Sequence, residues 1–262
     1  MDIDLNADLG EGYGPWRMGE DDALLELVSS ANVACGFHAG DPVIMERTVR
    51  AAKARGIDVG AHVGFPDRQG FGRRTMQIET AELASFVVYQ LGALAGIARA
   101  AGYRMTHMSF HGALGNMAAA DAALAEPLVR AVADFDPGLI ISSSTSRAIE
   151  NAAERCGLRV ATTFLADRAY DDEGLLVSRK LPDSVIKDEA AVLARVRRLL
   201  HDGTVLSYSG KALAMNVRSI LLHGDTPGAV ALARTIRHEI ESAGRRIVPT
   251  SRQLQARGRH DA

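Results

Sequence analysis

Seven short apolar runs recur along the chain, and each has the length and composition of a buried β-strand. They cover residues 3–9, 31–37, 57–62, 103–109, 138–144, 158–164 and 217–223. Between them, apolar residues at helical spacing predict helices at 21–30, 41–56, 80–102, 121–135, 146–157, 188–203 and 224–244. Residues 165–187 are polar and loop-rich. The chain therefore alternates strands with helices.

The segment 41–56 is the most clearly delimited of the predicted helices. Asp41 suits the cap position, Pro42 suits the first helical position, and Gly56 stands beyond the last turn.

Strands that alternate with helices are typical of a parallel sheet with crossover connections. Seven such units favour a closed or nearly closed β/α barrel over an open doubly wound sheet. Neither a Gly/Ser-rich linker nor a shift in composition divides the chain, so we expect residues 1–250 to form a single β/α barrel domain. Residues 251–262 are polar, show no pattern that would pair them with another element, and are expected to fray.

Composition narrows the classes of partner and compartment. With 47% hydrophobic residues, 24% charged residues and a net charge of −2, the 262-residue chain gives no electrostatic reason to expect nucleic acid or a membrane surface. Cys35 and Cys156 lack metal-ribbon or redox spacing. The acidic start is unlike a signal peptide, and no apolar run reaches membrane-spanning length, so a cytoplasmic protein is expected.

Side chains capable of chemistry gather where the predicted strands end. In a parallel barrel these ends meet on one face, which is where active sites lie. Five of the eight histidines fall there, and packing alone accounts poorly for that convergence. The residues concerned are Asn6, Asp8, Glu11, Asn32, His38, His62, His107, His111, Asp167, Arg168, His223 and Asp225.

Several of these residues also have a structural interpretation when taken singly. Asp8 and Glu11 can cap the segment that follows them, and His62 can be a core histidine bonded to the backbone. Asp225 can cap the next helix, and it can do so while also serving a site.

His107 and His111 lie four residues apart, a spacing that on a helix would let both bind one metal. Here residues 103–109 read as a strand, and Gly112 interrupts the pattern directly afterwards. We therefore expect His107 within the strand, as either a wall residue or a site residue. His111 is expected in the loop beyond it and is the better candidate for chemistry.

Two glycine-rich stretches, LGEGYGP at 9–15 and QGFGRR at 69–74, resemble nucleotide-binding loops only superficially. Neither has the spacing, the lysine or the hydroxyl of a phosphate-binding loop. The chain thus shows no ATP site of its own.

Several blocks of the sequence together resemble the LamB/YcsF family. The most specific is IDLNADLGEGYGPWRMGEDDALLELVSSANVACGFHAGDP at 3–42. It is followed in order by GAHVGFPDRQGFGRR at 60–74, HGAL at 111–114, LADRAY at 165–170 and HGDTPGAVALAR at 223–234. The resemblance extends to about residue 244.

The resemblance implies a deformed seven-stranded β/α barrel related to polysaccharide deacetylases and certain glycoside hydrolases. It also implies an activity, the ATP-dependent opening of the 5-oxoproline lactam to glutamate, carried out together with partner subunits B and C. ATP would then be handled through the partners, which agrees with the missing phosphate loop.

Lactam opening requires an activated carbonyl, a positioned water and protonation of the leaving nitrogen. Asp8 or Glu11 is the expected base, and His62 or His111 the expected acid. The remaining candidates are expected to bind substrate: Asn6, His38, Arg73, Asn116, Asp167, His223 and Asp225. A divalent metal held by Asp8 with His38 or His62 is the other possibility.

The chain departs from the family pattern at Ser109, Phe110 and Gly115, where the family block has lysine, proline and tyrosine. These departures predict a reshaped pocket and leave a shifted substrate open. Two further functions also stay open: an ATP-independent, metal-dependent amidohydrolase or deacetylase, and a non-catalytic protein that binds a metabolite or acts as a scaffold.

Overall fold

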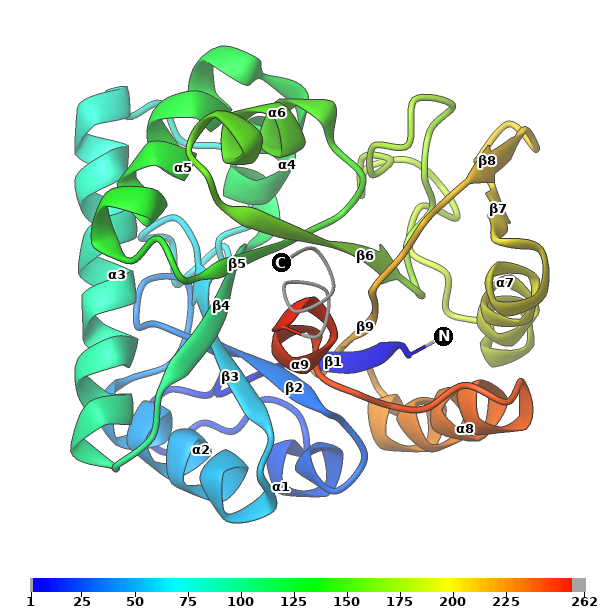
Figure 1. Ribbon diagram of the computed structural model, residues 1–262, viewed down its shortest axis with the longest axis horizontal. Helices are drawn as coiled ribbons and strands as arrows, with labels where there is room; N and C mark the ends of the chain where they lie inside the picture. The colour runs from blue at the N-terminus through cyan, green and yellow to red at the C-terminus, as the bar shows by residue number, and fades with distance from the viewer. Residues whose placement is uncertain (1, 256–262) are drawn as a thin grey trace.

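The computed structural model describes residues 2–255, and at its centre is a closed barrel of seven parallel strands (Figure 1). The strands are β1 (Asp4–Leu9), β2 (Ser30–Ala34), β3 (Asp58–Val63), β4 (Met105–Phe110), β5 (Ile140–Ser143), β6 (Arg159–Leu165) and β9 (Ser219–His223). Strand β9 pairs with both β6 and β1 and so closes the barrel. All seven overlap the predicted runs, so the seven-stranded parallel β/α barrel is confirmed.

Helices surround the barrel (Figure 1). They are α1 (Asp21–Leu25), α2 (Pro42–Arg55), α3 (Thr80–Ala100), α4 (Gly112–Ala120), α5 (Ala122–Phe135), α6 (Arg147–Arg155), α7 (Glu189–Asp202), α8 (Ala229–Ser242) and α9 (Thr250–Gln255). Helix α2 has the predicted ends. The Asp41 side chain accepts hydrogen bonds from two amides of the first turn, and Gly56 ends the helix with φ of 68°. Because a left-handed residue suits glycine, this end is defined by the sequence.

The structure contains three elements that the hydrophobic pattern did not indicate. Strands β7 (Thr204–Leu206) and β8 (Ala212–Ala214) form a small antiparallel pair. Helix α4 begins at Gly112, where the sequence suggested an interruption. A Cβ atom at Gly112 would lie 2.7 Å from the carbonyl oxygen of Gly72, so glycine permits close contact between the helix start and the 63–74 loop. This tertiary contact overrides the low helical propensity of glycine.

The third element, α9, corrects the prediction of a frayed tail. Ser251 and Gln253 are buried, and the Gln253 side-chain amide donates hydrogen bonds to the carbonyl oxygens of Arg218 and Val248. The helix lies across the amino-terminal end of the barrel (Figure 1). Its polar side chains thus bond to backbone groups there, and the prediction is wrong for residues 251–255. Residues 256–262 of the predicted tail lie outside the described residues.

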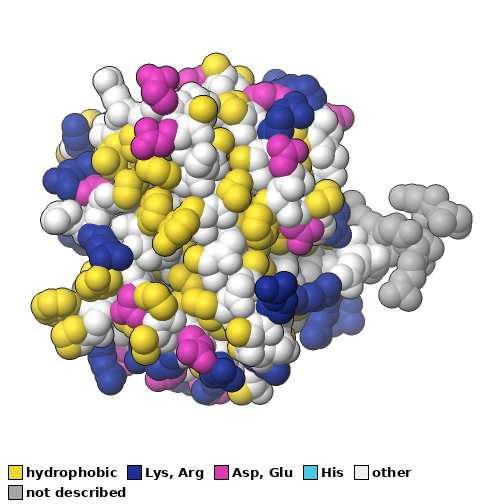
Figure 2. All heavy atoms as spheres, turned by 90° about the vertical axis from the view of Figure 1, so that its left-hand side faces the viewer, with side chains coloured by type: hydrophobic (Ala, Val, Ile, Leu, Met, Phe, Trp, Pro, Cys, Tyr) yellow, Lys and Arg dark blue, Asp and Glu magenta, His cyan; other side chains and the backbone are white. Residues whose placement is uncertain are grey.

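Helix α3 is, within the described range 2–255, the one helix long and apolar enough to span a membrane by composition, with a hydropathy of 1.5. Its inner stripe, including Val87, Leu91 and Leu94, is fully buried, and the helix contacts β3, β4 and α5. Its outer face exposes Val88 and Tyr89, and apolar side chains gather on this side of the molecule (Figure 2). The inner stripe explains much of the apolar character, because it covers the barrel.

A row of buried polar side chains runs through the barrel interior. Ser30 donates a hydrogen bond to Asp4 and accepts one from the side-chain amide of Asn6. Asn6 also contacts Asn32, whose amide donates to Asp8 at 2.8 Å. Residues 4, 6 and 8 alternate along β1 and therefore face the same side. The row connects the amino-terminal end of the barrel to its carboxyl-terminal end.

Candidate functional site

The carboxyl ends of the strands open into a pocket of about 760 Å³. It lies where the sequence placed the convergence of strand ends. Carboxylate, imidazole and hydroxyl groups line its inner part, and basic side chains line its outer part. The lining includes Asp8, His62, Arg73, Ser109, His111, Asn116, Ser142, Thr163, Arg168, Arg179 and His223.

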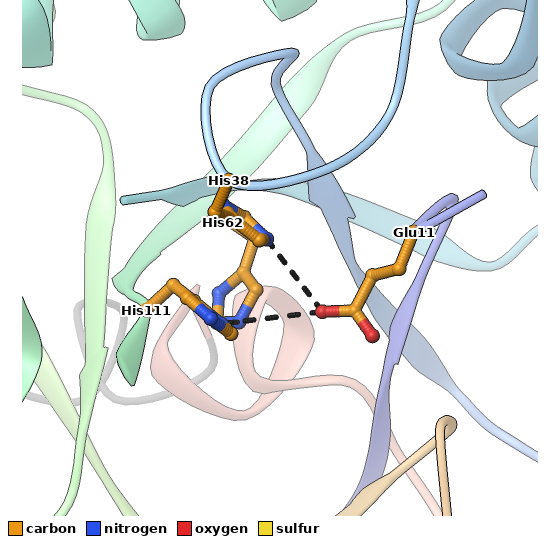
Figure 3. A group of neighbouring side chains, drawn as sticks. All are labelled: Glu11, His38, His62 and His111. Carbon is orange, nitrogen blue, oxygen red and sulfur yellow. Dashed lines mark hydrogen bonds and ion pairs between the residues drawn. The ribbon is translucent and has the colours of Figure 1, made fainter. Parts of the chain in front are cut away.

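Four side chains meet at one point beside this pocket. Glu11 follows β1, His38 follows β2, His62 ends β3 and His111 follows β4. One nitrogen or oxygen atom of each lies within 4.8 Å of those of the others, and all four residues are buried (Figure 3). Four consecutive units of the barrel therefore each supply one polar group to the same place.

Hydrogen bonds fix two of these imidazoles. His111 Nε2 lies 2.7 Å from the carbonyl oxygen of Phe71, which can only accept, so this nitrogen carries the proton. His111 Nδ1 then presents its lone pair 2.9 Å from His62 Nε2. On its other side, His62 Nδ1 lies 2.7 Å from the Ser109 hydroxyl.

The 63–74 loop holds the histidines in place through unusual backbone geometry. Phe71, whose carbonyl receives the His111 proton, has φ of 52°, a strained value for a residue with a side chain. A Cβ atom at Gly72 would lie 2.8 Å from both His38 and His111. One at Gly64 would lie 2.7 Å from His38 Nδ1. The loop can approach the rings this closely because both positions are glycine.

Burial and mutual repulsion keep these groups from ionising freely. Burial and the neighbouring His62 hold the pKa of His38 well below its usual range, and burial with His38 does the same for His111. Burial and then the charge of Asp8 raise the pKa of Glu11 well above its ordinary value. In isolation the cluster thus favours neutral imidazoles and a proton on Glu11.

Asp8 behaves in the opposite way. Burial opposes its ionisation, but His62, His223 and the Asn32 amide outweigh burial and hold the pKa of Asp8 below its usual range. Its Oδ2 atom lies 3.4 Å from His62 Nε2. Two buried carboxylates with pKa values moved in opposite directions are typical of acid–base sites.

Asp167 and His223 form a separate pair at the ends of β6 and β9. His223 Nδ1 lies 2.8 Å from both carboxylate oxygens of Asp167. Burial opposes the charge on each, yet their attraction raises the pKa of His223 and lowers that of Asp167. His223 lines the pocket, and Asp167 orients it.

Arg73 and Asp225 form an ion pair of 2.8 Å that joins the 63–74 loop to the loop after β9. The Arg73 guanidinium also lies over the Phe71 ring, 4.7 Å from its centre. Asn116 is an exposed residue of α4 on the pocket wall. These predicted residues therefore reach the rim of the pocket rather than its floor.

Two other candidates lie inside the barrel. Asn6 is buried below Asp8 and bonds to Ser30 and Asn32. His107 is also buried, and its Nε2 atom lies 3.1 Å from the Asn32 side-chain oxygen. His107 and His111 thus have different positions, as their placement at a strand end predicted, with His107 in the wall and His111 at the site.

Three residues of the pocket were not predicted to act in it. Ser109 was noted only as a departure from the family pattern, yet its hydroxyl contacts His62. Arg168 is buried and donates to the carbonyl oxygens of Val177 and Ser184. Arg179 lies in the loop-rich stretch 165–187 and lines the pocket without any sequence pattern to single it out. Only the position of Arg168 beside Asp167 carried a signal.

The four-residue cluster is also the group that could hold a metal ion. The sequence suggested Asp8, His38 and His62 for this role. The structure brings His38 and His62 together with Glu11 and His111, while Asp8 adjoins the group through His62. Carboxylate and imidazole groups are common ligands of zinc-like ions.

The fold and the pocket define a parallel β/α-barrel protein with a buried carboxylate–histidine site at the carboxyl end of its strands, an arrangement typical of enzymes. The sequence model of the LamB/YcsF family matches residues 3–255, and the chain belongs to that family.

Comparison with individual proteins agrees with this assignment. The chain is 72% identical to a 5-oxoprolinase A subunit of Pseudomonas syringae pv. tomato, over 97% of this chain and 99% of the relative. It is 70% identical to a 5-oxoprolinase A subunit of Ralstonia nicotianae, over 97% and 98%. The crystal structure of a lactam utilization protein from Thermus thermophilus superposes with a TM-score of 0.88 at 40% identity, covering 95% of this chain and 99% of that one.

Proposed function

We propose that this chain is the A subunit of an ATP-dependent 5-oxoprolinase and opens the 5-oxoproline lactam to L-glutamate together with partner subunits B and C. The two relatives at 70% and 72% identity, which carry that name over nearly their full length, support the assignment. The structural observation that carries it is the pairing of Asp8, whose environment favours the charged form, with His62 at the pocket.

The reaction adds one water across the ring C–N bond. The water oxygen bonds to the carbonyl carbon, the C–N bond breaks, and one proton passes from the water to the ring nitrogen. Asp8 is the base that accepts this proton, because its carboxylate is charged at neutral pH. His62 contacts both Asp8 and His111, so these imidazoles provide a route for the proton towards the leaving nitrogen.

The substrate carries a carboxylate, and the outer pocket suits an anion. Burial and the like charges of Arg73 and Arg168 lower the pKa of Arg179 to about 10. Three guanidinium groups near one another are stabilised when an anion binds among them. Arg179 is therefore the residue that we assign to the substrate carboxylate, with Arg73 and Arg168 behind it.

ATP enters this scheme through the partners B and C. The chain has no phosphate-binding loop, and its two glycine-rich stretches lack the required lysine and hydroxyl. The phenyl ring of Phe71 and the backbone of Gly72, in the second of these stretches, pack against the histidines instead. The cytoplasm is the expected compartment.

Glutamate release from 5-oxoproline tests the proposal, measured with the chain alone and with partners B and C, with and without ATP. We expect release only when chain, partners and ATP are all present, and a loss of at least about 100-fold in Asp8→Asn. Asp134→Asn, a change at the outer surface of α5 away from the pocket lining, is the matched control and should retain full activity.

Two results would contradict the proposal. Release by the chain alone without ATP would indicate an independent amidohydrolase. Full turnover by a folded Asp8→Asn complex would indicate a non-catalytic scaffold.

The same assay tests the carboxylate site. Arg179→Met should raise the KM for 5-oxoproline about 10- to 100-fold, because a charged hydrogen bond is worth about 1.5–3 kcal/mol. Arg130→Met removes an exposed arginine that pairs with Glu126 on α5, and it should leave the KM unchanged. An unchanged KM in Arg179→Met would move the carboxylate site elsewhere.

A further inference from the structure

We infer that Glu11, His38, His62 and His111 form a binding site for one divalent transition-metal ion. The atoms that face one another are Glu11 Oε1, His38 Nε2, His62 Nε2 and His111 Nδ1 (Figure 3). This set replaces the one suggested by the sequence, because Glu11 and His111 take the place of Asp8.

The first support is the absence of partners for buried polar atoms. Within residues 2–255, Glu11 Oε1 and both ring nitrogens of His38 have no hydrogen-bond partner. Glu11 is only 5% exposed and His38 only 1%. A buried polar atom without a partner costs about 1–3 kcal/mol, so native proteins rarely leave several of them together. A cation bound between Glu11 and His38 satisfies both residues at once.

The second support is that the lone pairs point in one direction. His111 donates its Nε2 proton to Phe71, which leaves the Nδ1 lone pair facing the cluster. His62 can donate its Nδ1 proton to Ser109, which leaves Nε2 free in the same way. Gly64 lies against His38 Nδ1, so Nε2 is the nitrogen that faces Glu11. Hydrogen bonds from the outer ring nitrogens are typical of histidines that bind metals.

The third support is the spacing of the ligand atoms. Around a tetrahedral ion with bonds of about 2.1 Å, ligand atoms lie roughly 3.4 Å apart. The separations here are 2.9 Å for His62–His111, 3.6 Å for His38–Glu11 and 4.0 Å for His111–Glu11. The three values lie on both sides of the ideal spacing, so small side-chain rotations suffice for binding.

The ligand set also indicates the kind of ion. Three imidazole nitrogens with one carboxylate oxygen suit zinc, cobalt, nickel or ferrous iron rather than magnesium or calcium, which favour oxygen ligands. Such an ion would act as a Lewis acid next to a pocket whose proposed substrate has a carbonyl group. The inference extends the proposed function by a cofactor, although binding itself does not depend on that function.

A cobalt titration of the full chain tests the inference. After treatment with a chelator, the chain is titrated with Co²⁺ and followed by its visible absorption, which reports tetrahedral coordination. We expect saturation at one equivalent. Glu11→Gln and His38→Gln should each weaken binding at least about 100-fold, because each removes one ligand. Circular dichroism checks that both variants are folded.

His223→Gln is the matched control, since His223 is another buried histidine of the same pocket but lies outside the four-residue set. It should bind Co²⁺ as tightly as the parent chain. The inference is overturned if the parent chain shows no Co²⁺ absorption, or if folded Glu11→Gln and His38→Gln both bind like His223→Gln.

The titration needs neither substrate nor partners, so it separates this inference from the proposed function. One-equivalent binding by a chain that opens no lactam would support the metal site and reject the proposed function. Lactam opening by a chain that binds no Co²⁺ would do the reverse.

Discussion

Both ends of the barrel bury a carboxylate, and the surroundings of the two carboxylates differ. At the amino-terminal end, Asp4 accepts hydrogen bonds from the hydroxyls of Ser29, Ser30 and Ser219. At the carboxyl-terminal end, Glu11 Oε1 has no hydrogen-bond partner within residues 2–255.

The charges near the two carboxylates differ in the same sense. Burial raises the pKa of Asp4 to about 6, and the three serine hydroxyls limit the rise. Around Glu11, burial acts together with the charges of Asp8 and Asp225, and no hydroxyl offsets them. One end therefore has a nearly complete hydrogen-bond network, whereas the other is suited to a further ligand.

This comparison shows how a structural polar cluster differs from a functional one when both are buried. A satisfied network fixes strand positions, because each partner would lose a hydrogen bond if the strands shifted. An unsatisfied cluster lowers stability, and such clusters concentrate at functional sites. The row Asp4–Ser30–Asn6–Asn32–Asp8 connects the two ends, so the rigid end supports the reactive end.

The largest expected effect comes from His62, which contacts Asp8, Ser109 and His111. His62→Asn should reduce turnover of 5-oxoproline by the assembled complex about 100- to 10,000-fold, because the proton route is interrupted. His201→Asn, at an exposed position of α7, is the control and should turn over normally. Turnover within about threefold of the parent in folded His62→Asn would remove the imidazoles from the mechanism.

The next effect concerns stability at the opposite end. Because the folded chain keeps the Asp4 proton up to about pH 6 whereas an unfolded chain loses it near 3.8, the free energy of unfolding falls as pH rises through this window. Asp4→Asn cannot ionise there. Urea unfolding should show the parent losing about 3 kcal/mol relative to the variant between about pH 4 and 6. Parallel pH curves for the two proteins would contradict this account of Asp4.

The smallest effect is expected at Ser109, which acts through His62. Ser109→Ala removes one hydrogen bond to the ring, so turnover should fall about 5- to 10-fold, equivalent to about 1 kcal/mol. Co²⁺ affinity should fall about 10-fold in the same variant. Ser85→Ala, in which a serine on the outer side of α3 is replaced, should change neither quantity. If both quantities also stay unchanged in Ser109→Ala, the hydroxyl does not orient His62.

Much of the fold could be predicted from sequence because its signals are local. Seven apolar runs separated by helical patterns define the barrel, and Asp41, Pro42 and Gly56 delimit α2. Helix α4 was missed because its start at Gly112 is stabilised by a contact with Gly72, a residue far away in the sequence. Helix α9 was missed because Gln253 bonds to the carbonyl of Arg218, another distant residue.

The site was predicted as a region more accurately than as a set of contacts. Strand-end placement brought out Glu11, His38, His62 and His111, since parallel strands place these ends together. It could not show that Asn6 points below the site or that Arg179 reaches the pocket, because both depend on side-chain direction and loop path. Nor could it exchange Asp8 for Glu11 among the metal ligands, a distinction of a few ångströms.

Turnover per folded molecule, compared between Glu11→Gln and Asp4→Ala, tests most directly whether the unsatisfied end is the reactive one. We predict that Glu11→Gln falls below about 1% of the parent. Asp4→Ala should stay within about twofold of the parent even though it loses stability, because its serine partners lie at the far end of the barrel. Normal turnover in Glu11→Gln, or a collapse of turnover in folded Asp4→Ala, would contradict the account.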